Sequence, residues 1–70
     1  MAEYGFYNDP SGLIKQVALA AYNRGKIAEN NLSYELAYAR YKRAHELDPE
    51  SVEYKQAFDH LSMLIDKLRK

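Results

Sequence analysis

The chain has 70 residues, which is enough for one domain, and it contains no cysteine, so neither disulfides nor a thiolate metal site can support its core. Ten basic residues balance ten acidic ones, which argues against nucleic-acid binding, because such proteins carry a basic excess that neutralises phosphates. No apolar run approaches the roughly 20 residues needed to cross a bilayer, and the N-terminus MAEYGFYNDPSG lacks the features of a signal peptide. We therefore expect a cytoplasmic protein that binds neither nucleic acid nor membrane.

The first ten residues form an aromatic segment that precedes any predicted helix. It carries Tyr4, Phe6 and Tyr7 around a glycine and ends in the pair Asp9-Pro10. Proline disfavours helix in the residue before it and is tolerated in the first turn after it. We expect residues 1–10 to form a lid over the open end of the helices, with an exposed arm as the alternative, and residues 11–70 to form a single helical domain.

The first predicted helix spans about residues 11–30. Ser11 is a suitable N-cap, and Asn30-Asn31 can adopt the left-handed conformation that ends a helix. Steps of three and four mark one helix face, and they are made by Ile14, Val17, Ala18, Ala21, Gly25 and Ala28, with Leu32 beyond the end. An interior glycine costs about 1 kcal/mol relative to alanine, so Gly25 suggests that another helix approaches closely there.

Two further helices follow. The second begins at Ser33, an N-cap residue, and ends near Leu47; the third begins after Pro49 and runs to about Arg69. The inward face of the second is predicted at Tyr34, Ala37, Tyr38, Tyr41, Ala44 and His45, and that of the third at Tyr54, Ala57, Phe58, Leu61, Leu64, Ile65 and Leu68. Short connections favour antiparallel neighbours. The predicted fold is therefore all-α, an antiparallel three-helix bundle.

From Ala18 to Ser51 the chain resembles a tetratricopeptide repeat. That family has a small residue within helix A, then an aromatic residue, alanine, a ring and alanine along helix B, and a proline at the exit. Those places hold Gly25, Tyr34, Ala37, Tyr41, Ala44 and Pro49, and the resemblance implies that the first five pack the interface between the two helices. The chain departs from the pattern at Ala21, Arg24, Ala28 and Leu32, where the family has tryptophan, leucine, tyrosine and the turn glycine.

The third helix resembles the capping helix that closes arrays of such repeats, with Asp59 where a second repeat would need a small residue. Microtubule-interacting-and-transport domains fit nearly as well. They are three-helix bundles that resemble one such repeat with a longer third helix, and the alanine-rich hairpin, Tyr41 and the long terminal helix look like that pattern. No motif in this sequence separates the two families.

The repeat resemblance implies a peptide-binding groove on the face of helix A, where the outward-facing residues are Leu19, Tyr22, Asn23, Lys26, Glu29 and Asn30. Asn23-Arg24 matches the pair with which some repeats clamp a C-terminal carboxylate, but Glu53 and Ala57 stand where the next helix would supply cations. The simpler interpretation is a solvated polar helix face. We expect a protein–protein interaction module that binds a peptide or helix. The alternative is a structural or engineered scaffold unit that folds alone or self-associates.

Nothing in the sequence predicts an enzyme, a cofactor or a metal site. His45 and His60 fall on different predicted helices, and neither shares the i, i+4 spacing of a zinc site with another histidine. The seven tyrosines are best explained as core rings with hydroxyls at the surface. The alternative is an aromatic interface, for which Tyr22 and Tyr38 are the candidates. Three side chains off the main faces could extend an exposed apolar patch, namely Leu19, Leu36 and Met63.

Overall fold

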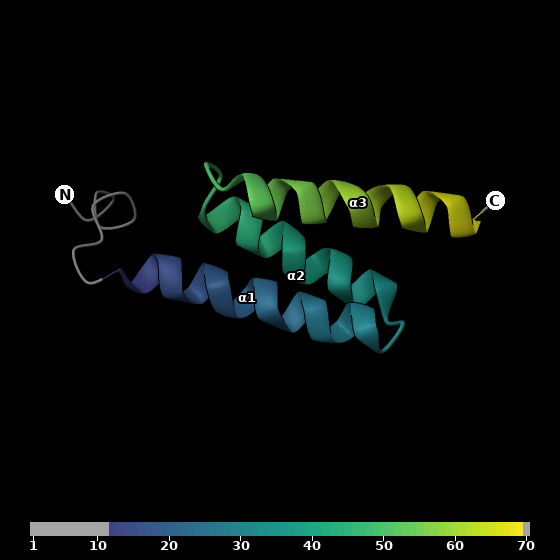
Figure 1. Ribbon diagram of the computed structural model, residues 1–70, viewed down its shortest axis with the longest axis horizontal. Coiled ribbons are helices and arrows are strands. Elements are labelled where there is room, and N and C mark those ends of the chain that lie inside the picture. The colour runs from purple at the N-terminus through teal and green to yellow at the C-terminus, as the bar shows by residue number, and fades with distance from the viewer. Residues whose placement is uncertain (1–11, 70) are drawn as a thin grey trace.

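The computed structural model describes residues 12–69 (Figure 1). It contains three helices, α1 (Leu13–Asn30), α2 (Tyr34–Leu47) and α3 (Val52–Arg69), and no strand within the described residues. The predicted all-α, antiparallel three-helix bundle is thus confirmed. The expected aromatic lid, the Ser11 cap and the domain boundary near Pro10 lie outside the described residues.

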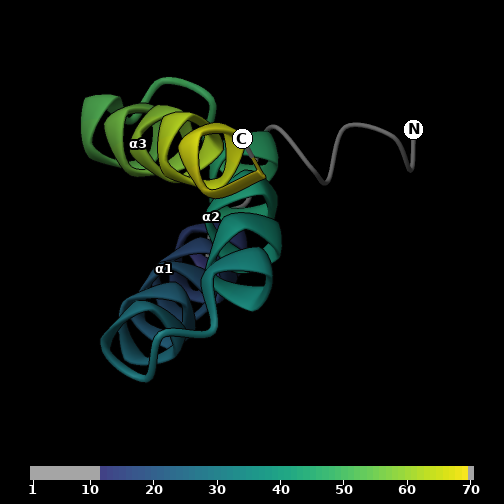
Figure 2. The same ribbon diagram turned by 90° about the vertical axis from the view of Figure 1, so that its right-hand side faces the viewer.

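The middle helix, α2, packs against each of the other two. α2 runs antiparallel to α1 and to α3 and packs against both, whereas the α1 and α3 backbones stay apart (Figure 1). An end-on view shows α1 and α3 on the same side of α2, splayed away from each other (Figure 2). The space between α1 and α3 is consequently bridged only by side chains.

Small residues bring α1 and α2 together. Ala18, Ala21, Gly25 and Ala28 are the buried residues of α1, and Ala37, Tyr41 and Ala44 are those of α2. A Cβ atom on Gly25 would lie 2.6 Å from both Cδ1 and Cε1 of Tyr41, closer than carbon atoms approach without strain. The absence of a side chain at Gly25 therefore makes room for the Tyr41 ring. Tyr34, also predicted at this interface, is half-buried and packs beside the cluster of Ala28, Ala37, Tyr41 and Leu61.

α3 adds larger side chains to the same core. Tyr54 and Leu61 are buried, and the Phe58 ring stacks on Tyr38 and on His45 of α2 with centroid distances of 5.1 Å and 5.8 Å. Leu68, predicted to face inward, is exposed. The reason is geometric, because the last turn of α3 runs past the start of α2 and has no helix opposite it (Figure 1).

Three predictions about α1 and the turn after it are wrong. Val17 and Leu32, expected on its inward face, are 42% and 70% exposed. The alanines and the glycine allow the backbones of α1 and α2 to come very close. Only these small residues of α1 are buried, and Val17 lies at the edge of the contact. The left-handed residue after α1 is Leu32, with φ of 64°, while Asn31 has φ of −89°.

Backbone hydrogen bonds explain the conformation of Leu32. The Ser33 N–H donates to the Ala28 carbonyl at 2.8 Å, and the Leu32 N–H donates to the Glu29 carbonyl at 3.0 Å. This is the Schellman pattern, which satisfies the last carbonyls of a helix and requires a left-handed residue at the position of Leu32. Ser33 precedes α2 as predicted but makes no side-chain capping bond, whereas the Ser51 hydroxyl accepts one from the Tyr54 N–H at 3.4 Å.

Candidate functional site

A groove opens between α1 and α3, with α2 beneath it. Its volume is about 490 Å³. Its lining comes from all three helices, with Tyr22, Lys26, Glu29 and Asn30 from α1, Tyr41 from α2, and Glu53, Gln56, Ala57 and His60 from α3. We call it the α1/α3 groove.

Tyrosine rings form its base. The Tyr22 ring lies between the other two, with its centroid 5.6 Å from that of Tyr41 and 5.0 Å from that of Tyr54. Tilted ring pairs at these distances are attractive beyond the area that they bury. Tyr22 is half-buried, and Tyr41 and Tyr54 are buried. Tyr22 and Tyr41 thus both line the groove, and the less buried Tyr22 ring packs against the buried rings of Tyr41 and Tyr54.

Glu29 of α1 contacts one residue of α2 and one of α3. Its Oε1 accepts a hydrogen bond from the Tyr41 hydroxyl at 2.8 Å, and its Oε2 lies 3.6 Å from Nε2 of His60. Burial, aided by this hydrogen bond and by the charge of Glu29, raises the pKa of the Tyr41 hydroxyl well above its usual value. Burial likewise raises the pKa of Tyr54. Both phenols therefore keep their protons to a higher pH than an exposed tyrosine, and Tyr41 donates its hydrogen bond to Glu29.

Polar side chains make up the rim. The Lys26 ammonium lies 5.4 Å from the centroid of the Tyr22 ring, within the range of a cation–π contact. Glu53 and Gln56 stand on the opposite side, on α3. The groove thus offers an aromatic surface, a cation and both donors and acceptors of hydrogen bonds.

The predicted peptide-binding residues divide into two sets. Tyr22, Lys26, Glu29 and Asn30 line the α1/α3 groove, whereas Leu19 and Asn23 are exposed on α1 without lining it. Arg24, the partner of Asn23 in the proposed carboxylate clamp, lines a different groove between α1 and α2. The two members of that pair are therefore not brought to one ligand position.

Five lining residues were not among the predicted binding residues and join the groove through tertiary structure, namely Tyr41, Glu53, Gln56, Ala57 and His60. Two short connections make α1 and α3 run in the same direction, so side chains far apart in sequence meet above α2. Glu29 and His60 are separated by 31 residues, and no local motif marks them. The only sequence signal for their meeting is the helix order itself.

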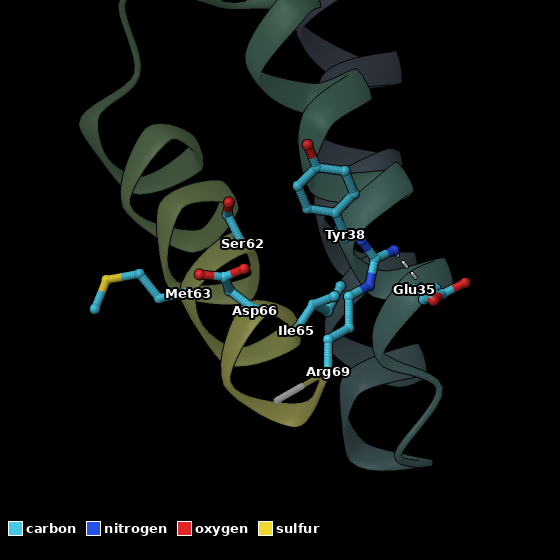
Figure 3. Close-up of a pocket in the computed structure, with 7 residues that line it drawn as sticks. All are labelled: Glu35, Tyr38, Ser62, Met63, Ile65, Asp66 and Arg69. Carbon is cyan, nitrogen blue, oxygen red and sulfur yellow. Dashed lines mark ion pairs between the residues drawn. The ribbon is translucent and has the colours of Figure 1, made fainter.

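A second groove lies between α2 and the C-terminal half of α3 (Figure 3), with a volume of about 440 Å³. Arg69 reaches across it toward Glu35, with Nη2 3.8 Å from Oε2 (Figure 3). Its remaining lining residues are Tyr38, Ser62, Met63, Ile65 and Asp66. Leu19, Leu36 and Met63 are all exposed, and Met63 lines this groove whereas Leu36 lines a different one.

Residues 12–69 also show two features that concern other kinds of site. They contain no group of three or more histidine, aspartate or glutamate side chains arranged to hold a metal ion. None of the three helices is long and apolar enough to span a membrane.

Comparisons with known proteins do not assign this groove. No family model matches the chain, and no curated protein or solved structure matches it either. Its interpretation therefore depends on its own geometry.

Proposed function

We propose that this protein is an interaction module that binds a short peptide or helix of a protein partner in the α1/α3 groove. The observation that carries the proposal is the Tyr22 ring, presented at the base of an open groove and held by Tyr41 and Tyr54. Rigid tyrosines are enriched among residues that dominate binding energy. Ligand sites typically combine such apolar surfaces with a few polar groups that fix orientation.

Binding fits this groove better than catalysis. The Glu29 carboxylate already engages Tyr41 and lies beside His60, so it serves as a structural link between helices. The groove residues include no serine or cysteine that a base could activate as a nucleophile. What remains available is a shaped, partly apolar surface, which recognises rather than transforms a ligand.

The rim indicates the kind of ligand. Lys26 is cationic, Glu53 is anionic, and Asn30 and Gln56 both donate and accept hydrogen bonds. A strongly acidic or basic partner would meet a like charge on one side. We expect an uncharged or mixed-charge segment with an apolar side chain over Tyr22 and Ala57.

The tetratricopeptide resemblance supports this proposal. Leu32, which stands where that family has its turn glycine, has the positive φ of 64° that such a position requires. Gly25 and Tyr41 make the close helix contact that the resemblance implies. We therefore propose a single tetratricopeptide-like hairpin capped by α3, with a microtubule-interacting-and-transport-like domain as the second choice. A cytoplasmic location remains part of the proposal.

Selection of peptides from a random library, with the folded chain as bait, tests this function. We expect an enriched family of sequences whose affinity falls about tenfold, or about 1.4 kcal/mol, in Tyr22→Ala and in Lys26→Glu. Lys42→Glu, an exposed charge change on α2 outside the groove, is the matched control and should not alter affinity. Helix content measured by circular dichroism separates loss of binding from loss of folding. Absence of enriched peptides, or equal binding by all folded variants, would contradict the proposal.

A second candidate function is structural, with the chain associating with itself. The observation that favours it is an exposed apolar and basic face on the α1–α2 hairpin, away from the α1/α3 groove.

A further inference from the structure

The groove between α1 and α2 differs in chemistry from the α1/α3 groove. Its volume is about 250 Å³. Arg24 and Ile27 contribute from α1, and Leu36 and Arg40 from α2. Ile27 is 60% exposed and Leu36 is 49% exposed. Tyr38 and His45 of α2, whose rings stack on α3, project about 140–160° away from Arg40 around the helix, so this basic groove faces away from α3.

The two arginines have no acidic partner among the residues that the structure describes. Across residues 12–69, neither Arg24 nor Arg40 lies within ion-pair distance of a carboxylate. The residues lining the basic groove include no aspartate or glutamate. A guanidinium favours carboxylates, with which it makes paired, charge-assisted hydrogen bonds. The basic groove therefore fits an occupant with a carboxylate near the arginines and an apolar side chain near Ile27 and Leu36.

The spacing of the groove residues defines that occupant further. Arg24 and Ile27 are three residues apart on α1, and Leu36 and Arg40 are four apart on α2. Each pair is separated by about one helical turn, roughly 5 Å along the axis. A helix with an apolar and an acidic side chain one turn apart could therefore place the acid beside the arginines and the apolar side chain beside Ile27 and Leu36.

The outer face of α3 carries such a pair. Met63 and Asp66 are three residues apart, and Met63 is 63% exposed. Figure 3 shows Met63 projecting away from α2, with Asp66 beside it at the mouth of the second groove. Among the described residues Asp66 has no ion-pair partner, whereas the nearby acids Asp59 and Glu35 are engaged by Lys55 at 3.0 Å and by Arg69 at 3.8 Å.

We propose that the chain associates head to tail, with Met63 and Asp66 of one copy docked in the basic groove of a second copy. Asp66 would meet Arg24 and Arg40, and Met63 would cover Ile27 and Leu36. The zero formal net charge of the chain leaves little general repulsion to oppose such an encounter. Because the contact joins two different surfaces, a pair of copies still has one free basic groove and one free Met63 and Asp66 surface. Further copies can add at both, which produces a closed ring or an open filament. The α1/α3 groove lies outside both surfaces.

Sedimentation velocity over a concentration series tests the proposal with charge-reversed variants. The parent should associate as concentration rises, and less so in high salt, which screens exposed charges. Arg40→Glu and Asp66→Lys should each weaken association by about tenfold, because each turns an attraction into a repulsion. Lys42→Glu and Glu46→Lys make the same charge changes at exposed positions outside both surfaces and should behave like the parent.

An equimolar mixture of Arg40→Glu and Asp66→Lys is the decisive sample. In the mixture, Glu at position 40 of one copy faces Lys at position 66 of the other, and the remaining surfaces form the original contact. Association should therefore return to the level of the parent. Three results would each overturn the proposal: a parent that stays monomeric up to its solubility limit, reversal variants that associate like the controls, or a mixture that shows no recovery. Circular dichroism on each variant confirms that it is folded.

Discussion

Adding one methyl group at Gly25 should destabilise the fold, although the same change stabilises most helices. The new Cβ would lie 2.6 Å from two atoms of the Tyr41 ring and 3.2 Å from a third. That ring is only 2% exposed, is packed beside Tyr22 and is tied to Glu29 by a hydrogen bond of 2.8 Å. It cannot swing aside without breaking these contacts.

The expected change in the free energy of unfolding follows from two opposing contributions. Overpacking a buried site costs about 2 kcal/mol, and replacing an interior helical glycine with alanine contributes about 1 kcal/mol in the other direction. We therefore expect Gly25→Ala to lower the free energy of unfolding by about 1 kcal/mol, measured by urea denaturation followed with circular dichroism.

Two further variants isolate the cause. Ala20→Gly, at an exposed position of α1, measures the helix-propensity term in the same helix and should cost about 1 kcal/mol. In a Tyr41→Leu background, which lacks the ring, Gly25→Ala should become neutral or stabilising. A Gly25→Ala protein that is more stable than the parent by the propensity term alone would refute the close contact between Gly25 and the Tyr41 ring.

Three other predictions follow from the core and can be measured with the same urea assay. Tyr41→Phe removes the hydrogen bond to Glu29 and should cost about 1 kcal/mol; an unchanged midpoint would show that the bond contributes nothing. Leu61→Ala, at a fully buried position, should cost about 2–5 kcal/mol, whereas Met63→Ala should change stability little because that side chain is exposed; equal effects would contradict the assigned burial. Because the pKa values of Tyr41 and Tyr54 are raised in the folded state, only the unfolded chain releases these protons above about pH 10. Stability should therefore be fully present below that pH and fall above it, and a flat profile would argue against buried phenols.

Much of the fold could be predicted because the spacing of small residues along the sequence identifies the interface between α1 and α2. Alanine and glycine at steps of three and four leave few alternatives to a close helix pair, and Gly25 itself indicates where the approach is tightest. Side chains at the edges could not be assigned in this way. Val17 follows the same spacing as Ala18 but lies just outside a contact face narrowed by the small residues.

The turn after α1 was mispredicted for a similar reason. Two asparagines are the expected left-handed residues, yet Leu32 takes that conformation because of the backbone bonds of Ser33 and Leu32 to Ala28 and Glu29. A leucine in this conformation costs roughly 1–2 kcal/mol. The hydrogen bonds that the last carbonyls of α1 accept, together with the placement of α2, therefore outweighed the conformational preference of leucine.

The candidate site was predictable only in part. Tyr22, Lys26 and Asn30 were accessible to sequence reasoning because they share one face of a single helix. The contact between Glu29 and His60 depends on how α1 and α3 splay over α2, with the Tyr22, Tyr41 and Tyr54 rings packed against one another between the helices. Such an angle is a property of packed side chains rather than of spacing.

The proposed role of the α1/α3 groove is tested most directly by mapping where a selected peptide contacts the chain, using backbone amide shifts in a nuclear magnetic resonance titration. The account predicts saturable shifts centred on Tyr22, Lys26 and His60, with Arg24 and Leu36 on the other side of the hairpin unaffected. Saturable shifts confined to Arg24, Ile27 and Leu36 would place the binding surface elsewhere and contradict it.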